Sequence, residues 1–259
     1  MSSPTAEVVQ TVLEEAKING VCFPPGDLYS NEPPLESDLH RDQISLLIRL
    51  LQWHWQQRQD FYVSGNITIY YSPHQRKSEN FRGPDFFVVL DTERKPRKSW
   101  VVWEEEGKYP NVIIELLSDS TAKTDRGLKK QIYQDTFRTP DYFWFDPNTL
   151  ELQGFHLLDG EYHELQPNQQ DQLWSQQLSL YLGIYNRELR FFTSDGQIIP
   201  SPEESARAAE AMVETERQRA ETERQRAETE RQRAEAERQR SEQLASRLRA
   251  LDVNPEAEA

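Results

Sequence analysis

The sequence predicts an α/β (α+β) protein with a mixed central β-sheet flanked by helices, followed by a long charged helix. Short runs rich in Val, Ile, Leu and Phe, at residues 85–90 and 112–117, are typical of strands buried on both faces. Segments with helical periodicity lie before and after these runs. The last ~55 residues are instead a charged repeat with few apolar residues, which separates them from the sheet-forming part.

Two helices are predicted before the sheet. Residues 5–17 have helical spacing with Thr5 as a possible N-cap, and a Pro- and Gly-rich loop follows to Leu35. The second helix begins after Ser37 and runs to about Arg58. Its apolar positions recur at helical spacing and predict a stripe that packs on the sheet: Ile44, Leu47, Ile48, Leu51 and Trp55.

The remaining elements are mostly strands. Residues 61–71 predict one strand or a bent pair, because Gly65 and Asn66 interrupt the run. Residues 85–90, 100–104, 111–117 and 142–145 predict further strands, with a helix ending near Phe137 before the last of them. A hairpin is expected over 152–165 around Asp159-Gly160, and more β-structure at 178–182 and 189–192.

The C-terminal part repeats Glu-Thr-Glu-Arg-Gln-Arg-Ala at 214–220, 221–227 and 228–234, with a variant at 235–241. The period is that of a coiled coil, but each repeat offers one alanine where a seam wants two large apolar residues. Charges three and four residues apart, such as Arg217 with Glu221, predict a solvated single helix. Large apolar residues occur near its two ends, where they are available for docking, dimerisation or a coiled coil: Met212, Val213, Leu244, Leu248 and Leu251.

We therefore expect three parts: a domain at 1–202 with an N-terminal helical arm, a helix at 203–251 and a disordered tail at 252–259. The net charge is −14, of which residues 203–259 contribute −4 and the rest −10. Such an acidic domain argues against binding nucleic acid through a broad basic face. Cys22 is the only cysteine, and the sequence has neither a signal peptide nor an apolar membrane span, so we expect a cytoplasmic protein without membrane contact.

Two acids stand in the apolar runs. Asp85 opens one run, Glu115 interrupts another, and a predicted helix then carries Asp125, Lys129 and Tyr133 four residues apart. A buried carboxylate is costly unless it is paired or binds a metal. One hypothesis is a divalent-metal phosphodiesterase site, with Lys129 orienting water or neutralising charge and Tyr133 contacting phosphate or supporting the lysine. The other is a structural ion pair between Glu115 and Lys129.

Several motifs resemble the bacterial putative restriction endonuclease family of the PD-(D/E)XK nuclease-like superfamily. They are Gly-Pro-Asp at 83–85, Glu-Leu-Leu-Ser-x-Ser-Thr from Glu115, Asp-Arg-Gly-x-Lys-x-x-x-Tyr from Asp125, and Pro-x-Tyr-x-x-Phe-Asp-Pro from Pro140. The resemblance implies a restriction-endonuclease-like fold and Mg²⁺- or Mn²⁺-dependent cleavage of DNA. It implies that Asp85 and Glu115 hold the metal.

The sequence departs from the superfamily in one position. The usual lysine falls two residues after the second acid, where this chain has Leu117, and the resemblance moves that role to Lys129 on the helix. The superfamily also has an early acid near the first long helix, for which Glu36 is the best match, with His40 one turn later. A Glu-His pair at a helix start is also a common capping arrangement.

Two functions remain open. The first is a metal-dependent endonuclease acting on DNA without an organic cofactor, possibly as a homodimer. The second is a catalytically silent nuclease-fold interaction module that uses its long charged helix for assembly. The acidic charge favours the second hypothesis, and the intact set of Asp85, Glu115 and Lys129 favours the first.

Overall fold

The computed structural model describes residues 17–18, 21–22, 37–72, 83–118 and 125–252. The chain divides into two units, Met1–Pro202 and Glu203–Ala259. Glu36 and all but the last residue of the helix expected at 5–17 lie outside the described residues. That last residue, Lys17, begins a short strand instead of ending a helix. This strand, β1 (Lys17–Ile18), pairs with β2 (Val21–Cys22). None of the described helices is long and apolar enough to cross a membrane.

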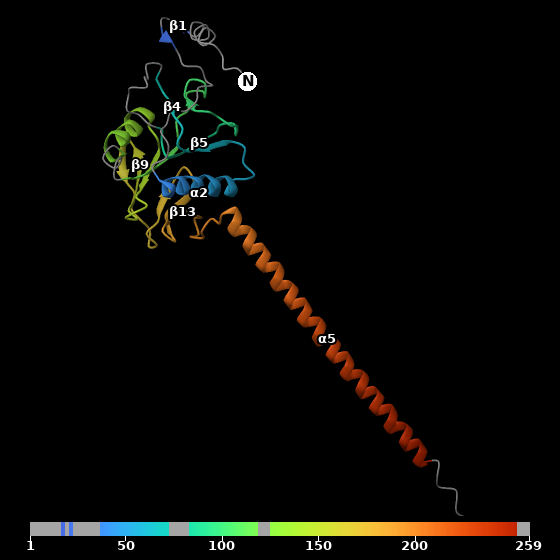
Figure 1. The fold of residues 1–259 in the computed structure, drawn as a ribbon. Helices are drawn as coiled ribbons and strands as arrows, with labels where there is room; N and C mark the ends of the chain where they lie inside the picture. The colour runs from blue at the N-terminus through green and yellow to red at the C-terminus, as the bar shows by residue number, and fades with distance from the viewer. Residues whose placement is uncertain (1–16, 19–20, 23–36, 73–82, 119–124, 253–259) are drawn as a thin grey trace, which may run out of the picture. The chain divides into compact units, whose positions relative to one another are not determined.

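The first unit is built on a six-stranded mixed sheet with the strand order β10-β9-β8-β7-β5-β3 (Figure 1). Its β7 and β8 are parallel, and the other neighbouring pairs are antiparallel. Its strands, in chain order, are β3 (Phe61–Ser64), β5 (Phe86–Leu90), β7 (Val112–Leu116), β8 (Asp141–Phe145), β9 (Leu152–Leu158) and β10 (Glu161–Glu164). The sheet confirms the mixed α/β prediction and places the two apolar runs side by side.

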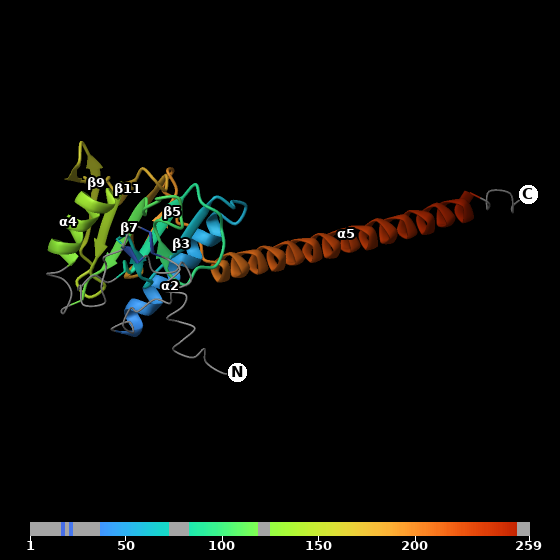
Figure 2. The same ribbon diagram turned by 90° about the horizontal axis from the view of Figure 1, so that it is seen from above.

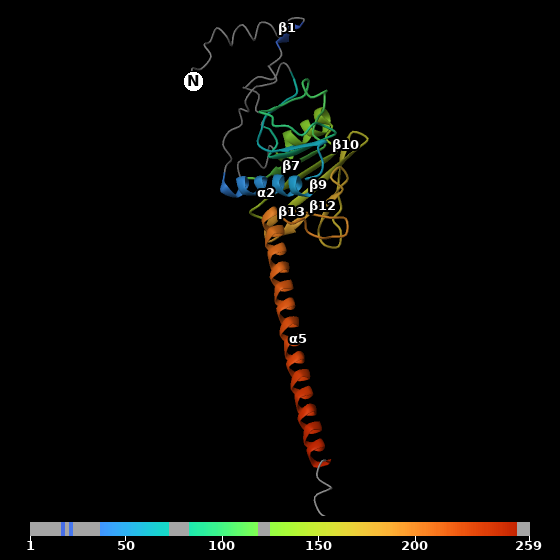
Figure 3. The ribbon, with the colours of Figure 1, turned by 90° about the vertical axis from the view of Figure 1, so that its right-hand side faces the viewer.

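One face of the sheet packs against helix α2 (Asp38–His54) and a small antiparallel sheet. That sheet consists of β11 (Leu173–Ser175), β12 (Leu180–Tyr185) and β13 (Glu188–Phe192). Helix α2 begins at the predicted Ser37 cap, and its buried stripe includes Ile44, Leu47 and Leu51. The amide of Gln43 exchanges two hydrogen bonds with the backbone of Leu189, which fixes α2 on β13 (Figure 3).

The opposite face is covered by the crossover between β7 and β8. Two parallel neighbouring strands such as β7 and β8 need a crossover connection. Here the connection contains a wide helix made of three consecutive parts: the π-helical η1 (Asp125–Lys129), the short α4 (Lys130–Ile132) and the π-helical η2 (Tyr133–Phe137). Tyr133 and Phe137 pack on sheet residues such as Phe87 and Ile113. The helix lies along the sheet in Figure 2. Arg138, in the left-handed conformation with φ of 52°, ends it after Phe137 as predicted.

The structure corrects several element boundaries. The bent pair at 61–71 separates into β3 and β4 (Ile69–Tyr70), and β4 pairs with β6 (Trp100–Val101). The strand expected at 100–104 stops early because the Glu104 amide donates to the Val101 carbonyl at 3.0 Å and turns the chain. The sequence did not predict β11, and it placed the next strand two residues early.

The second unit is one continuous helix, α5 (Pro202–Asp252), of 51 residues (Figure 2). The helix extends one residue beyond each end of the predicted 203–251, so the expected disordered tail does not begin at Asp252. Arg217 and Arg219 pair with Glu214 and Glu216, three residues earlier, at 3.2 and 3.1 Å. Arg238 and Glu242 form a pair four residues apart at 3.6 Å, so the helix has ion pairs at both of the expected spacings.

Candidate active site

The pairing of β5 with β7 brings Asp85 and Glu115 together. The two strands are antiparallel with Phe86 opposite Ile114, so the next positions outward are Asp85 and Glu115. The Leu116 amide donates to Oδ2 of Asp85 at 2.8 Å, and the Asp85 amide lies 3.4 Å from Oε2 of Glu115. Both acids therefore lie at the same end of the same strand pair, each touching the backbone of the other strand.

Glu115 is fully buried, and both of its carboxylate oxygens have protein partners. Lys129 Nζ donates to Oε2 at 3.0 Å, and the Tyr133 hydroxyl donates to Oε1 at 2.5 Å. The pKa of Glu115 is raised to about 7; burial is the largest cause and the charge of Asp85 adds to it, while Lys129 and Tyr133 lower the pKa and offset part of the rise. The site thus lacks enough positive charge to hold this carboxylate in its ordinary ionised form.

The wide crossover helix supplies both partners of Glu115. Its buried row is Lys129, Tyr133 and Phe137, whereas Leu128 is 53% exposed. Helical spacing alone predicts that Leu128, Ile132 and Thr136 form the packed row with Lys129 beside it, and this prediction is wrong. The two aromatic rings of the neighbouring row bury more apolar surface, and they carry Lys129 into the interior with them.

Lys129 reaches the acids, and its neighbour Lys130 lies elsewhere. The same helical spacing predicts that Lys130 extends into solvent, but Lys130 is half-buried, with Nζ 3.5 Å from the centre of the Phe155 ring. Burial lowers the pKa of Lys130. Of these two lysines, Lys129 is the one whose contact with Glu115 the structure shows.

His40 connects the first turn of α2 to the strand that carries Glu115. It is buried, its Nε2 lies 3.2 Å from the Leu116 carbonyl oxygen, and its Nδ1 lies 3.0 Å from the Ser37 hydroxyl. Since a carbonyl only accepts, Nε2 carries the hydrogen and Nδ1 of the neutral ring accepts from Ser37. Ser37 caps the helix, and His40 holds the backbone directly after Glu115.

Asp125 begins η1, but its side chain is outside the described part of the structure, as is the whole of Glu36. The sequence did not reveal Gly65, where a Cβ atom would lie 2.2 Å from the Asp85 carbonyl oxygen. Its place beside Asn66 suggested only a turn, whereas its missing side chain also lets the chain pass close to Asp85.

The donor set fits a small divalent cation. Carboxylate oxygens are the ligands that Mg²⁺ and Mn²⁺ prefer, and Mg²⁺ is usually held by one or two carboxylates together with water and substrate phosphate. Asp85 and Glu115 supply two such groups, and the raised pKa of Glu115 shows that the site would gain from added positive charge. Across the described residues, no group of three or more His, Cys, Asp or Glu gathers into a metal cage.

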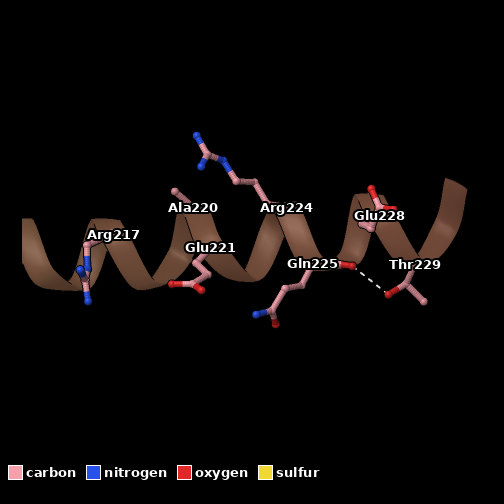
Figure 4. Close-up of a pocket in the computed structure, with 7 residues that line it drawn as sticks. All are labelled: Arg217, Ala220, Glu221, Arg224, Gln225, Glu228 and Thr229. Carbon is pink, nitrogen blue, oxygen red and sulfur yellow. Dashed lines mark hydrogen bonds between the residues drawn. The ribbon is translucent and has the colours of Figure 1, made fainter. Parts of the chain in front are cut away.

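A surface depression on α5 offers no competing active site. It is lined by residues of that one helix over about three turns, including Arg217, Ala220 and Thr229 (Figure 4). A single helix cannot enclose a substrate, so the chemistry of Asp85, Glu115 and Lys129 is the better guide to function.

Comparison with known proteins assigns the chain to a family. The family model described as "Putative restriction endonuclease", named Uma2, matches residues 21–193, which is most of the chain and includes all three site residues. The chain therefore belongs to this family of nuclease-like proteins.

Solved structures add one distant likeness. A crystal structure titled as a putative nuclease of the DUF820 group from Anabaena variabilis ATCC 29413 is similar with a TM-score of 0.42 and 12% identity. The similarity covers 62% of this chain and 80% of that one. The search of curated proteins gave no match.

Proposed function

We propose that this protein is a cytoplasmic endonuclease that hydrolyses DNA phosphodiester bonds with Mg²⁺ or Mn²⁺. The observation that supports the proposal best is the meeting of Asp85, Glu115 and Lys129 at one strand end, although they come from two strands and a helix. Membership of the putative restriction endonuclease family supports DNA as the substrate.

Each residue has a defined role in this proposal. Asp85 and Glu115 would hold the cation, which would supply a positive charge to polarise a phosphoryl oxygen and lower the pKa of a water molecule. Lys129 places a positive charge beside Glu115, where it orients the attacking water or neutralises charge that develops on the phosphate. Tyr133 fixes the orientation of Glu115 through its 2.5 Å hydrogen bond, and His40 holds the adjacent backbone.

A specific observation favours the alternative, a nuclease fold used only for binding. Both oxygens of Glu115 already have protein partners, and a buried ion pair with Lys129 is sufficient to explain that contact. The acidic charge of the chain also disfavours tight contact with a polyanion. In this alternative, α5 serves assembly and the acids are structural.

Metal binding separates the two functions before any substrate is known. A nuclease site predicts that Mn²⁺ or Mg²⁺ raises the melting temperature of the wild-type protein, because a ligand that binds only the folded state stabilises it. Asp85→Asn should remove this increase, while Asp91→Asn, at an exposed aspartate next to the end of β5, should retain it. A melting temperature that no divalent cation changes would favour the binding module.

A further inference from the structure

The long helix α5 has one heptad position that is small or apolar along its whole length. Every described side chain from Ala206 to Ala250 is exposed, including those of this row. Val213 and Leu248 are 70% and 64% exposed, which is unusual for large apolar residues. The members of this row, which we call the alanine row, are Ala206, Val213, Ala220, Ala227, Ala234, Ser241 and Leu248.

Charges of opposite sign border the alanine row on its two sides. With about 3.6 residues per turn, the positions three after and four before an alanine lie on one side of it, and the positions three before and four after lie on the other. Around Ala220 the first side has Glu216 and Glu223, and the second side has Arg217 and Arg224. The same arrangement recurs with each seven-residue repeat, so the helix carries a glutamate flank and an arginine flank.

The small side chains leave a depression in the helix surface. Its lining includes Ala220 with Arg217 and Arg224, and Figure 4 shows the short Ala220 side chain beside the longer Arg224. Alanine lets a second helix approach closely, and the flanking charges then lie within reach of the partner. The ion pairs within α5 do not prevent this, because Arg217 and Glu214 are 73% and 50% exposed and exposed pairs exchange at little cost.

We propose that the alanine row joins the α5 helices of two copies of this chain in a parallel, in-register pair. In a parallel twofold pair, the glutamate flank of each helix faces the arginine flank of the other. In an antiparallel pair, glutamate would face glutamate and arginine would face arginine. Like charges facing each other are unfavourable, so the order of charges selects both a second copy as the partner and the direction of pairing.

The ends of the helix add to the contact. Leu244 and Leu248 lie four residues apart on one face near the C-terminus, and Val213 occupies the alanine row near the N-terminus. Parallel pairing brings Val213 and Leu248 each against its own copy and places Leu244 at the edge of the contact, which buries apolar surface at both ends of the row. The centre is held by alanine and by ion pairs, so we expect an association that weakens with added salt.

Cysteine cross-linking in the full chain tests the direction of pairing. In a Cys22→Ser background, Val213→Cys and Leu248→Cys should each form a disulfide-linked dimer with itself. The control Thr222→Cys lies on the opposite side of the helix from Ala220, and its yield should be lower by about tenfold, because only paired residues have a high effective concentration. Cross-links that form only between Val213→Cys and Leu248→Cys chains would show antiparallel pairing and overturn the proposal.

Charge variants test whether the two charged flanks cause the helices to pair. One variant replaces the arginine flank with glutamate, at Arg217, Arg224, Arg231 and Arg238. A second variant replaces the glutamate flank with arginine, at Glu216, Glu223, Glu230 and Glu237. Light scattering should give twice the 30.5 kDa chain mass for the wild type and for the mixture, but the single-chain mass for each variant alone. Circular dichroism checks that both variants remain helical. A monomeric wild type, or a dimer that neither variant weakens, would refute the proposal.

Discussion

The Glu115→Gln substitution distinguishes a metal-binding carboxyl group from half of a structural ion pair, because the two hypotheses predict opposite changes in the free energy of unfolding. The pKa of this buried carboxyl is about 7 in the folded chain and 4.5 as its ordinary value. Below pH 4.5 the group is protonated in both the folded and the unfolded states, and it does not affect the free energy of unfolding. Between pH 4.5 and 7 the unfolded chain has lost the proton and the folded chain retains it, so stability falls as the pH rises. Above pH 7 the penalty is complete, on the order of 3 kcal/mol for a shift of this size.

Glutamine removes this penalty because it stays neutral at every pH. Without metal, Glu115→Gln should therefore differ least from the wild type near pH 5, and it should equal or exceed the wild type at pH 8, by up to about 3 kcal/mol. The gain will be smaller to the extent that Lys129 loses its partner. Urea unfolding in EDTA at pH 5, 6, 7 and 8 measures the difference directly.

The ion pair between Arg97 and Glu105 provides the control for this experiment. Arg97 and Glu105 form a buried, two-bond pair at 2.5 and 2.8 Å, with side chains only 4% and 14% exposed. Glu105→Gln leaves that arginine without its carboxylate and should destabilise the fold at pH 8. If Glu115→Gln destabilises by about 3–5 kcal/mol at the same pH, as breaking a buried pair does, the metal-site reasoning is wrong and Glu115 is structural.

Three further changes test other parts of the structure. Lys129→Ala should abolish DNA cleavage and slightly destabilise the fold. Lys130→Ala should leave cleavage intact because Lys130 lies against Phe155. Equal losses of cleavage in a plasmid assay would contradict these roles. Tyr133→Phe removes the hydrogen bond that lowers the pKa of Glu115, so metal binding, followed by calorimetry, should require a higher pH than in the wild type; an unchanged pH dependence would exclude this role. Deleting residues 203–259 should leave the melting temperature of the remaining chain unchanged, and a loss of its circular dichroism signal would show that the two units depend on each other.

Much of the fold could be predicted because it is encoded in local patterns. The Ser37 cap, the hairpin at Asp159-Gly160 and the stop after Phe137 each depend on a few adjacent residues, and the structure has all three. Asp85 and Glu115 could be singled out because a lone acid in an apolar run requires a partner. Their apposition also follows from antiparallel pairing, once the pairing partners are known.

The features of the fold and the site that the sequence did not predict depend on contacts between residues distant in the chain. The choice between Leu128 and Tyr133 as the packed row rests on the surfaces that the sheet offers, which spacing alone does not show. The contact of His40 with Leu116 spans 76 positions and involves a backbone oxygen, which no sequence pattern marks. The strand β11 exists because β12 lies beside it, and its three residues have no clear periodicity of their own.

Cleavage of DNA by the purified full-length protein tests the proposed nuclease most directly. Plasmid DNA should be nicked or linearised with Mg²⁺ or Mn²⁺ and remain intact with EDTA. Asp85→Asn and Glu115→Gln should both be inactive while folded, and Lys130→Ala should cut like the wild type. Cutting that persists in both acid variants, or a wild type that cuts no form of DNA with either metal, would contradict a catalytic site at Asp85, Glu115 and Lys129.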